Sequence, residues 1–176
     1  VGQMSSLLGS SIVSFVLIWW LAIEVSNAAT FSIAFLLIRL PTFFIVIFAG
    51  PFIDRLNRKK IILVTDSAQV VIVLMLMGLF WLQLQSFWGV FSLLIISSFF
   101  ESVHSITIRA IIPSMIPKDQ LSRMNSVHNI SYHVILLISP PIAGFLISFL
   151  DISVILWIDV ITYLLALIPT IFIVIP

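Results

Sequence analysis

The chain has 176 residues, of which 61% are hydrophobic and only 9% are charged. Soluble domains carry about 45–50% apolar and about 25% charged residues, so this composition excludes a soluble globular protein and indicates an integral membrane protein. The formal net charge of +1 carries little information as a total, and we expect membrane lipid, not nucleic acid, as the surrounding partner. Because the chain has no cysteine, disulfides and thiolate chemistry are excluded.

Apolar stretches of membrane-spanning length alternate with short polar interruptions along the whole chain. At about 20 residues per crossing, its length leaves room for about six helices. We therefore predict an all-α, integral membrane six-helix bundle, with helices at about residues 3–25, 29–52, 61–82, 87–111, 121–149 and 152–175.

The basic residues outside the second span gather in or beside two turns, namely Arg55, Arg58, Lys59, Lys60, Arg109, Lys118 and Arg123. Since basic loops stay on the cytoplasmic side, this bias predicts a multi-pass protein of the cell membrane with both ends of the chain cytoplasmic. No cleavable signal peptide is visible, because Val1 runs directly into an apolar span. We expect the chain to be one half of a twelve-span protein.

The first two spans each carry an unusual polar feature. Small residues recur near helical spacing in the first span, at Ser6, Gly9, Ser10, Val13 and Ser14. Such a face favours close helix contact, and a ligand-facing serine stripe is the alternative. In the second span, Arg39 lies about 16 Å from the following turn, near the bilayer midplane. A charge there needs an ion-pair partner or a water-filled cavity.

The turn after the second span reads Gly-Pro-Phe-Ile-Asp-Arg-Leu-Asn-Arg-Lys-Lys from Gly50 to Lys60. Its pattern Gly-x-x-x-Asp-Arg-x-x-Arg-Lys resembles the signature loop of the major facilitator superfamily of secondary transporters. The resemblance implies the amino-terminal half of such a transporter, built from two inverted three-helix repeats. It also implies a latch that holds the two halves in the outward-open state, formed by Gly50, Asp54, Arg55, Arg58 and Lys59. From charge alone, a plain positive-inside anchor is the alternative. Phe52, Ile53 and Asn57 depart from the usual residues of the family.

Polar residues of the fourth and fifth spans lie at matching depth. Glu101, His104 and Ser105 share one helical face, and His128, Asn129 and Tyr132 form a stripe on the next span. We therefore predict a shared cavity for protons or substrate, lined by Arg39, Glu101, His104, His128, Asn129 and Tyr132. For Glu101, a proton or cation site, a fixed ion pair with Arg39 and a lipid-boundary position remain open; the histidines can equally be helix-bonding residues. No ligand pattern for a metal is recognisable, and we expect no cofactor.

Two further carboxylates lie inside predicted spans. Asp66 lies near the cytoplasmic end of the third span, where we expect it to pair with basic loop residues or Arg109. Asp159 lies in the sixth span, and there we favour a helix-packing role over a cavity role.

The fifth span contains Ser139-Pro140-Pro141-Ile142-Ala143-Gly144. This resembles the motif that marks drug antiporters within the superfamily, with Ser139 and Ala143 in place of two glycines. The resemblance implies an antiporter-like helix kink at Ser139, Pro140, Pro141 and Gly144, and a plain Pro-kinked packing surface is the alternative. The turn from Arg109 to Leu121, with Asn125, is similar to that of bacterial macrolide efflux and enterobactin exporters.

The leading hypothesis from the sequence is proton-coupled export of amphiphilic small molecules or drugs by alternating access, together with a missing carboxy-terminal six-helix half. A dedicated metabolite or siderophore exporter is one alternative, and a non-transporting six-helix membrane scaffold is another. An intramembrane enzyme is disfavoured, since no Gly-x-Ser-x-Gly or His-Glu-x-x-His pattern and no paired aspartates on adjacent helices occur.

Overall fold

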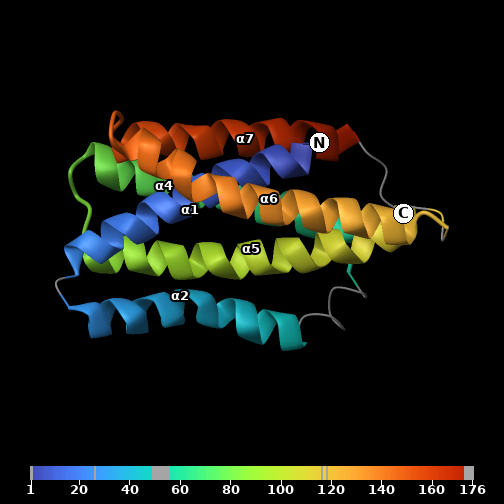
Figure 1. Cartoon of the computed structure of the whole chain (residues 1–176), viewed down its shortest axis with the longest axis horizontal. Helices are drawn as coiled ribbons and strands as arrows, with labels where there is room; N and C mark the ends of the chain where they lie inside the picture. The colour runs from blue at the N-terminus through green and yellow to red at the C-terminus, as the bar shows by residue number, and fades with distance from the viewer. Residues whose placement is uncertain (1, 26, 49–55, 116, 118, 173–176) are drawn as a thin grey trace.

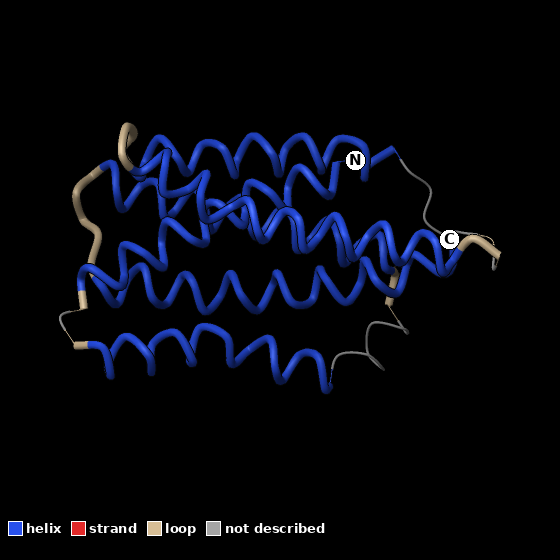
Figure 2. Tube along the Cα trace, viewed as in Figure 1, coloured by secondary structure: helices blue, strands red, loops and turns tan. Residues whose placement is uncertain are grey.

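The computed structural model describes residues 2–25, 27–48, 56–115, 117 and 119–172, and all regular structure in these ranges is helical. The helices are α1 (Gly2–Glu24), α2 (Ala28–Phe48), α4 (Arg58–Trp81), α5 (Phe87–Met115), α6 (Leu121–Ile147) and α7 (Ile152–Phe172). They lie side by side, and successive helices run in opposite directions (Figure 1). The described turns lie at the two ends of the bundle (Figure 2). The predicted all-α six-helix architecture is confirmed.

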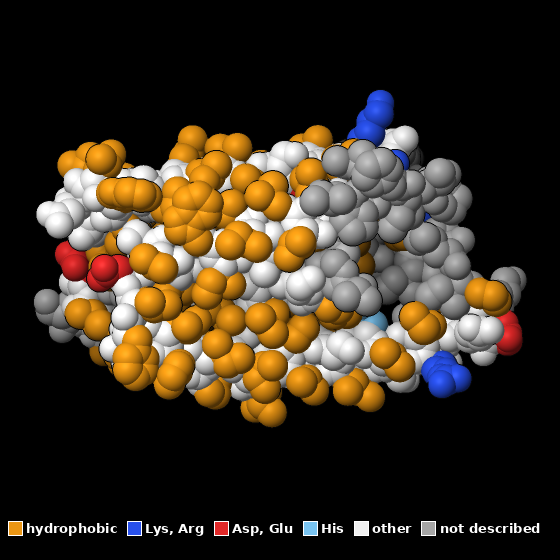
Figure 3. Space-filling model, turned by 90° about the horizontal axis from the view of Figure 1, so that it is seen from above, with side chains coloured by type: hydrophobic (Ala, Val, Ile, Leu, Met, Phe, Trp, Pro, Cys, Tyr) orange, Lys and Arg blue, Asp and Glu red, His pale blue; other side chains and the backbone are white. Residues whose placement is uncertain are grey.

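The outer surface of the bundle is apolar along its length. Helices α1, α2, α4, α5 and α6 are each long and apolar enough to cross a membrane, and α7 contains the shorter apolar stretch Ile152–Leu167. On the face shown in Figure 3, hydrophobic side chains cover the flank and the described Lys and Arg side chains lie toward one end. On α2, Ile33, Leu36, Phe43 and Val46 are all more than half exposed, as lipid contact requires. The chain is a multi-pass membrane protein.

Helix α4 begins at Arg58, three residues before the predicted start. The side chain of Asn57 accepts a hydrogen bond from the backbone N–H of Lys60 at 3.2 Å. This capping interaction satisfies a donor at the helix start and stabilises it by about 0.5–2 kcal/mol. As a result, Arg58, Lys59 and Lys60 form the first turn of α4, and not part of a loop as the sequence had indicated.

Helix α5 ends at Met115, which lies beyond Pro113. The span predicted from the sequence ends near Ile111, before this proline. A proline does remove one backbone hydrogen bond, but the residues before it keep theirs. The helix can therefore extend past the proline at the cost of that one bond.

The closely packed helix pairs follow an internal symmetry. Helix α1 packs on α6 and α7, α5 packs on α2 and α4, and α4 packs on α7. Exchanging α1, α2 and α4 with α5, α6 and α7, in that order, leaves this set of pairs unchanged. Since corresponding helices run in opposite directions, this is the pairing expected of two inverted three-helix repeats.

The core lies between α1, α4, α5 and α7. Leu17, Leu21, Leu76, Ile155 and Leu156 are among its fully buried side chains. Helices α2 and α6 are more peripheral, and few of their described side chains are buried. The arrangement leaves polar side chains of α1, α4, α5 and α7 facing one another inside the bundle.

Candidate functional site

A cavity opens between α1, α4, α5, α6 and α7, with a volume of about 100 Å³. Its apolar lining includes Met4, Leu7 and Ile108. The polar lining residues are Gln3, Ser6, Ser10, Asp66, Gln69, Glu101, His104, Ser105, Arg109, His128, Tyr132 and Tyr163. Because ligand pockets combine apolar walls with a few convergent polar groups, this cavity is the candidate binding site.

A second, smaller cavity adjoins the first. The two share Ser10, Gln69, Glu101 and Tyr163 in their walls. The second cavity adds Arg39, Asp159 and a largely apolar group, Val13, Leu17, Ile18, Ile38, Val73, Leu76 and Leu94. A chain of polar side chains therefore leads from the basic end of α5, at Arg109, into the middle of the bundle.

The structure brings together most of the residues that the sequence predicted to face a cavity. Glu101 and His104 from α5, and His128 and Tyr132 from α6, all line the first cavity. Asn129 is exposed and belongs to the wall of neither cavity. Side chains from the two helices thus line one cavity, and the roles of these residues in transport stay predictions.

Arg39 and Glu101 both line the second cavity, but no ion pair joins them in the described part of the chain. Arg39 is exposed, and its guanidinium carbon lies 5.7 Å from the centre of the Phe35 ring, within cation–π range. Glu101 is also exposed on the surface of the bundle. Both side chains are thus accessible, and both line the second cavity.

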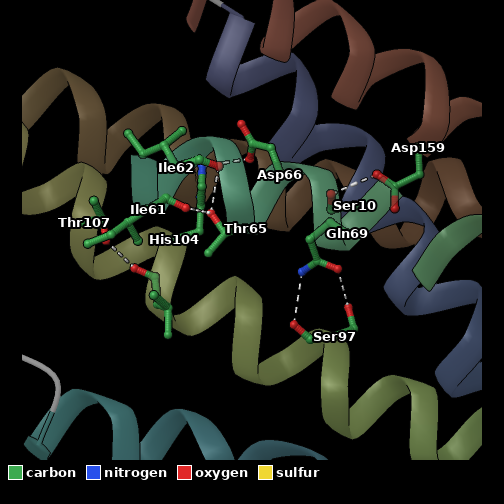
Figure 4. A network of polar contacts seen from close by, with 11 residues as sticks. Ser10, Ile61, Ile62, Thr65, Asp66, Gln69, Ser97, His104, Thr107 and Asp159 are labelled. Atoms are coloured by element: carbon green, nitrogen blue, oxygen red, sulfur yellow. Dashed lines mark hydrogen bonds and ion pairs between the residues drawn. The ribbon is translucent and has the colours of Figure 1, made fainter. Parts of the chain in front are cut away.

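A buried carboxylate lies on the inner wall, where Asp66 Oδ1 is 3.2 Å from His104 Nε2 (Figure 4). The sequence analysis had expected Asp66 to pair with Arg109 or the basic turn. Asp66 and His104 lie on the packed faces of α4 and α5, so the histidine reaches the carboxylate first. The sequence signal for a paired position was the carboxylate itself, since ionisable residues inside spans are costly and face polar partners.

Sequence reasoning missed two other polar contacts in the same region. Gln69 Nε2 donates to the carbonyl of Ser97 at 3.0 Å, and Ser97 Oγ donates to Gln69 Oε1 at 2.9 Å. Ser10 Oγ donates to Asp159 Oδ1 at 2.8 Å. Figure 4 shows both contacts bridging neighbouring helices. Asp159 thus joins two helices, as the expected packing role requires, and it also lines the second cavity.

The predicted latch falls only partly within the described residues. Gly50, Asp54 and Arg55 lie outside them, while Arg58 and Lys59 open α4. Arg58 Nη1 donates to the backbone carbonyl of Ala110 on α5 at 3.1 Å. A cation close to the carboxy-terminal end of a helix is favourable, because the carbonyl groups there carry partial negative charge. The contact joins the start of α4 to the last turns of α5.

Pro140 and Pro141 lie inside α6, which continues through them to Ile147. The hydroxyl of Ser139 donates to the carbonyl of Ile135 at 2.7 Å, and both Ser139 and Ala143 are buried. Since α6 packs mainly on α1, these small residues occupy that contact. Gly144 is exposed, on a different side of the helix.

We expect the variant Gly144→Ala to leave folding intact, because a Cβ at this position would meet nothing within 4 Å. Alanine favours a helix over glycine by about 1 kcal/mol, so thermal stability of the purified protein should stay equal or rise. A loss of transport with unchanged stability would show that Gly144 contacts another part of a longer protein. Unfolding or aggregation of the variant would contradict the expectation.

In the described part of the chain, no group of three or more His, Asp or Glu side chains could hold a metal ion.

Comparison with known proteins points to a transporter family. The model of the Major Facilitator Superfamily matches residues 1–176. The chain is 32% identical over 165 residues to "Macrolide efflux protein A" of Streptococcus pyogenes. The aligned region covers 90% of this chain and 39% of that protein. A macrolide efflux protein A of the serotype M6 strain matches with the same figures.

The chain thus spans about two fifths of the length of the curated relatives it matches. No solved structure matches it. The family match extends over the whole chain, the identity to the two efflux proteins extends over most of it, and the helix pairing is that of inverted three-helix repeats. On these grounds the chain belongs to the Major Facilitator Superfamily.

Proposed function

We propose that this chain is the amino-terminal six-helix half of a secondary transporter that exports amphiphilic small molecules, coupled to protons, by alternating access. The observation that carries the proposal is the open cavity in which Glu101, His104, His128 and Tyr132 stand beside apolar walls. The relatives named macrolide efflux protein A support export as the direction. Their greater length leaves room for a second, carboxy-terminal half that would close the cavity.

The lining of the cavity fits an amphiphilic substrate. Met4, Leu7 and Ile108 offer apolar contact, and methionine adapts to ligands of different shape. Tyr132 and Tyr163 combine an aromatic face with a hydroxyl group. A site of this kind binds molecules that have a large apolar body and a few polar groups, which is the substrate class we propose.

Proton coupling is assigned to Glu101. It is exposed, it lies in the wall of both cavities, and no described residue holds it in an ion pair. A carboxyl group in this setting can take up a proton in one conformation and release it in the other, and its charge would then bias the equilibrium between the two.

We further propose that the protein lies in the cytoplasmic membrane with the basic ends of α4 and α5 on the cytoplasmic side. Arg58, Lys59 and Lys60 at the start of α4 lie close to the end of α5, as the contact between Arg58 and Ala110 requires. Basic residues retained on one side set the orientation of membrane helices. The start of α1 and the end of α7 lie at this same end of the bundle (Figure 1).

The experiment that tests the function is uptake of a fluorescent cationic dye into inverted membrane vesicles that contain the full-length protein. Uptake that is driven by a proton gradient and collapses with a protonophore is the expected result. Vesicles without the protein supply the background. Uptake equal to this background, with a panel of amphiphilic dyes and macrolides, would overturn the proposal in favour of a non-transporting scaffold.

For the latch, we expect Asp54→Asn to reduce dye uptake about 10-fold or more, because a charge-assisted hydrogen bond is worth about 1.5–3 kcal/mol. The substitution keeps the shape of the side chain and removes only its charge. Asp119→Asn, in the turn before α6, is the matched control and should transport as the wild type does. Full transport by Asp54→Asn would leave the turn as a plain positive-inside anchor.

A further inference from the structure

The contact between Asp66 and His104 is incompletely satisfied. The Asp66 side chain is only 2% exposed, and its Oδ2 atom has no hydrogen-bond partner among the described residues. His104 Nε2 is also buried, and although it lies 3.2 Å from Asp66 Oδ1, it makes no directed hydrogen bond. Leaving a buried polar atom unpaired costs about 1–3 kcal/mol, and more for a charged group. The attraction between the two side chains is therefore chiefly electrostatic and depends on a proton held by the pair.

His104 connects this buried carboxylate to the cavity. Its side chain is 21% exposed and lines the cavity wall, while its Nε2 atom points inward at Asp66 (Figure 4). An imidazole can accept a proton at one ring nitrogen and give up the proton of the other. A proton bound at the cavity-facing nitrogen makes His104 cationic; transfer of the Nε2 proton to Asp66 Oδ1 leaves a neutral imidazole and a neutral carboxylic acid.

A second buried carboxylate, Asp159 in the second three-helix repeat, has a partner that does not titrate, the hydroxyl of Ser10. Asp66 and Asp159 each lie about two turns from the start of their helices, α4 and α7, which exchange places under the internal symmetry. Asp159 receives a well-formed hydrogen bond from the hydroxyl of Ser10 on α1. A neutral hydroxyl therefore suffices to hold a buried carboxylate at this place in the fold. The histidine on α5 supplies a proton-binding group that packing does not require.

Other ionisable groups lie near the pair on α5, α6 and α7, and in the adjoining cavity on α2 and α7, where Asp159 also lines the wall. The groups that share the cavity wall with Asp66 and His104 are Glu101 and Arg109 of α5, Tyr163 of α7, and His128 and Tyr132 of α6. From α1 only uncharged side chains, such as Gln3, Ser6 and Ser10, reach the wall. On α2, Arg39 lies in the adjoining cavity. Among the described residues, Arg109 is the Lys or Arg side chain that lines the same cavity as the pair.

We propose that the Asp66–His104 pair is a second proton-binding site, in which His104 passes protons between the cavity and the buried Asp66. The inference rests on the proposed proton-coupled function and adds a site to it. Protonation of the pair draws α4 and α5 together; loss of the proton leaves a buried carboxylate facing a neutral ring and loosens this contact. The occupancy of the site would then favour one arrangement of the cavity wall over the other.

The test is a double-mutant cycle on the purified full-length protein, with thermal unfolding measured across a series of mildly acidic to alkaline pH values. The variants are Asp66→Asn, His104→Gln and their combination. His133→Gln is the control, because His133 is exposed on α6 and outside both cavity walls. We expect a coupling of several degrees in Tm at acidic pH that disappears at alkaline pH. A coupling that is equal at all pH values, or absent at all of them, overturns the proposal.

The transport assay separates this proposal from the proposed function. We expect His104→Gln to shift the pH at which dye efflux is half-maximal, while His133→Gln leaves it unchanged. Should Asp66→Asn fail to fold, the pH profiles of wild type and His104→Gln still decide, because a purely structural histidine would lower transport equally at every pH. Protonophore-insensitive transport by the wild type would refute proton coupling, whereas proton-driven transport with an unshifted profile in His104→Gln would refute only the second site.

Discussion

Replacing Glu101 by Gln should reduce proton-driven dye uptake to the level of vesicles that lack the protein. Gln keeps the size and hydrogen-bonding shape of the side chain but cannot bind and release a proton. Since Glu101 lines both cavities and is held in no ion pair within the described residues, its loss removes the accessible carboxyl group at the point where the cavities meet. Uptake should be measured in inverted vesicles with equal amounts of each variant.

The matched control is Glu24→Gln, because Glu24 is the other glutamate of the chain and is exposed at the end of α1. It should transport at the wild-type rate. Binding of substrate by Glu101→Gln, measured as quenching of the dye on the purified protein, should persist, since most of the lining is unchanged. If Glu101→Gln keeps proton-driven transport, the coupling site lies elsewhere, and the pair formed by Asp66 and His104 becomes the first place to look.

Replacing Gly9 by Ala should destabilise the bundle. A Cβ at Gly9 would overlap the Oγ1 atom of Thr162 on α7 and would lie 3.1 Å from the Cβ of that residue, which its backbone holds in place. Overpacking of this kind costs about 1–3 kcal/mol. Alanine gains about 1 kcal/mol over glycine in helix propensity, so the net loss of unfolding free energy falls to about 0–2 kcal/mol. Thermal unfolding of the purified protein measures it.

Gly78→Ala provides the comparison, because a Cβ at Gly78 of α4 would meet nothing within 4 Å. It should be neutral or stabilising, so Gly9→Ala should have the lower Tm of the two variants. Adding Thr162→Ala to Gly9→Ala removes the Oγ1 and Cγ2 atoms that crowd the new methyl group, and part of the stability should return. Equal Tm values for Gly9→Ala and Gly78→Ala would show that α1 and α7 can separate without cost.

Hydropathy alone predicted the number and approximate place of the helices. This succeeds in a membrane protein because the backbone N–H and C=O groups of a span must form their hydrogen bonds within that span. The length and apolar character of each span can therefore be recognised from a short stretch of sequence. The same holds for the depth of Glu101 and His128, which follows from counting along straight helices. Their matching depth was therefore predictable, whereas their meeting in one cavity depends on how the helices pack.

The predicted start of α4 and the predicted end of α5 were wrong. The side chain of Asn57 starts α4 before the basic residues, and α5 continues past Pro113. Asn57 and Pro113 are both typical of turns. At Asn57 the side chain supplies one hydrogen bond to the helix start, and at Pro113 the helix loses one backbone hydrogen bond but continues. Such balances of about one hydrogen bond are too small for residue type to decide.

Which side chains meet was decided only by the tertiary structure. The sequence placed Asp66 among basic residues and offered Arg39 as a fixed partner for Glu101, yet Asp66 lies against His104 and Arg39 against the ring of Phe35. Gly9 was recognisable as a contact residue, but its neighbour Thr162 was not. The sequence by itself determined the spans, the membrane setting and the depth of each polar residue. The rotation of each helix about its axis depends on packing against all its neighbours at once, and that rotation determines which polar groups share a cavity.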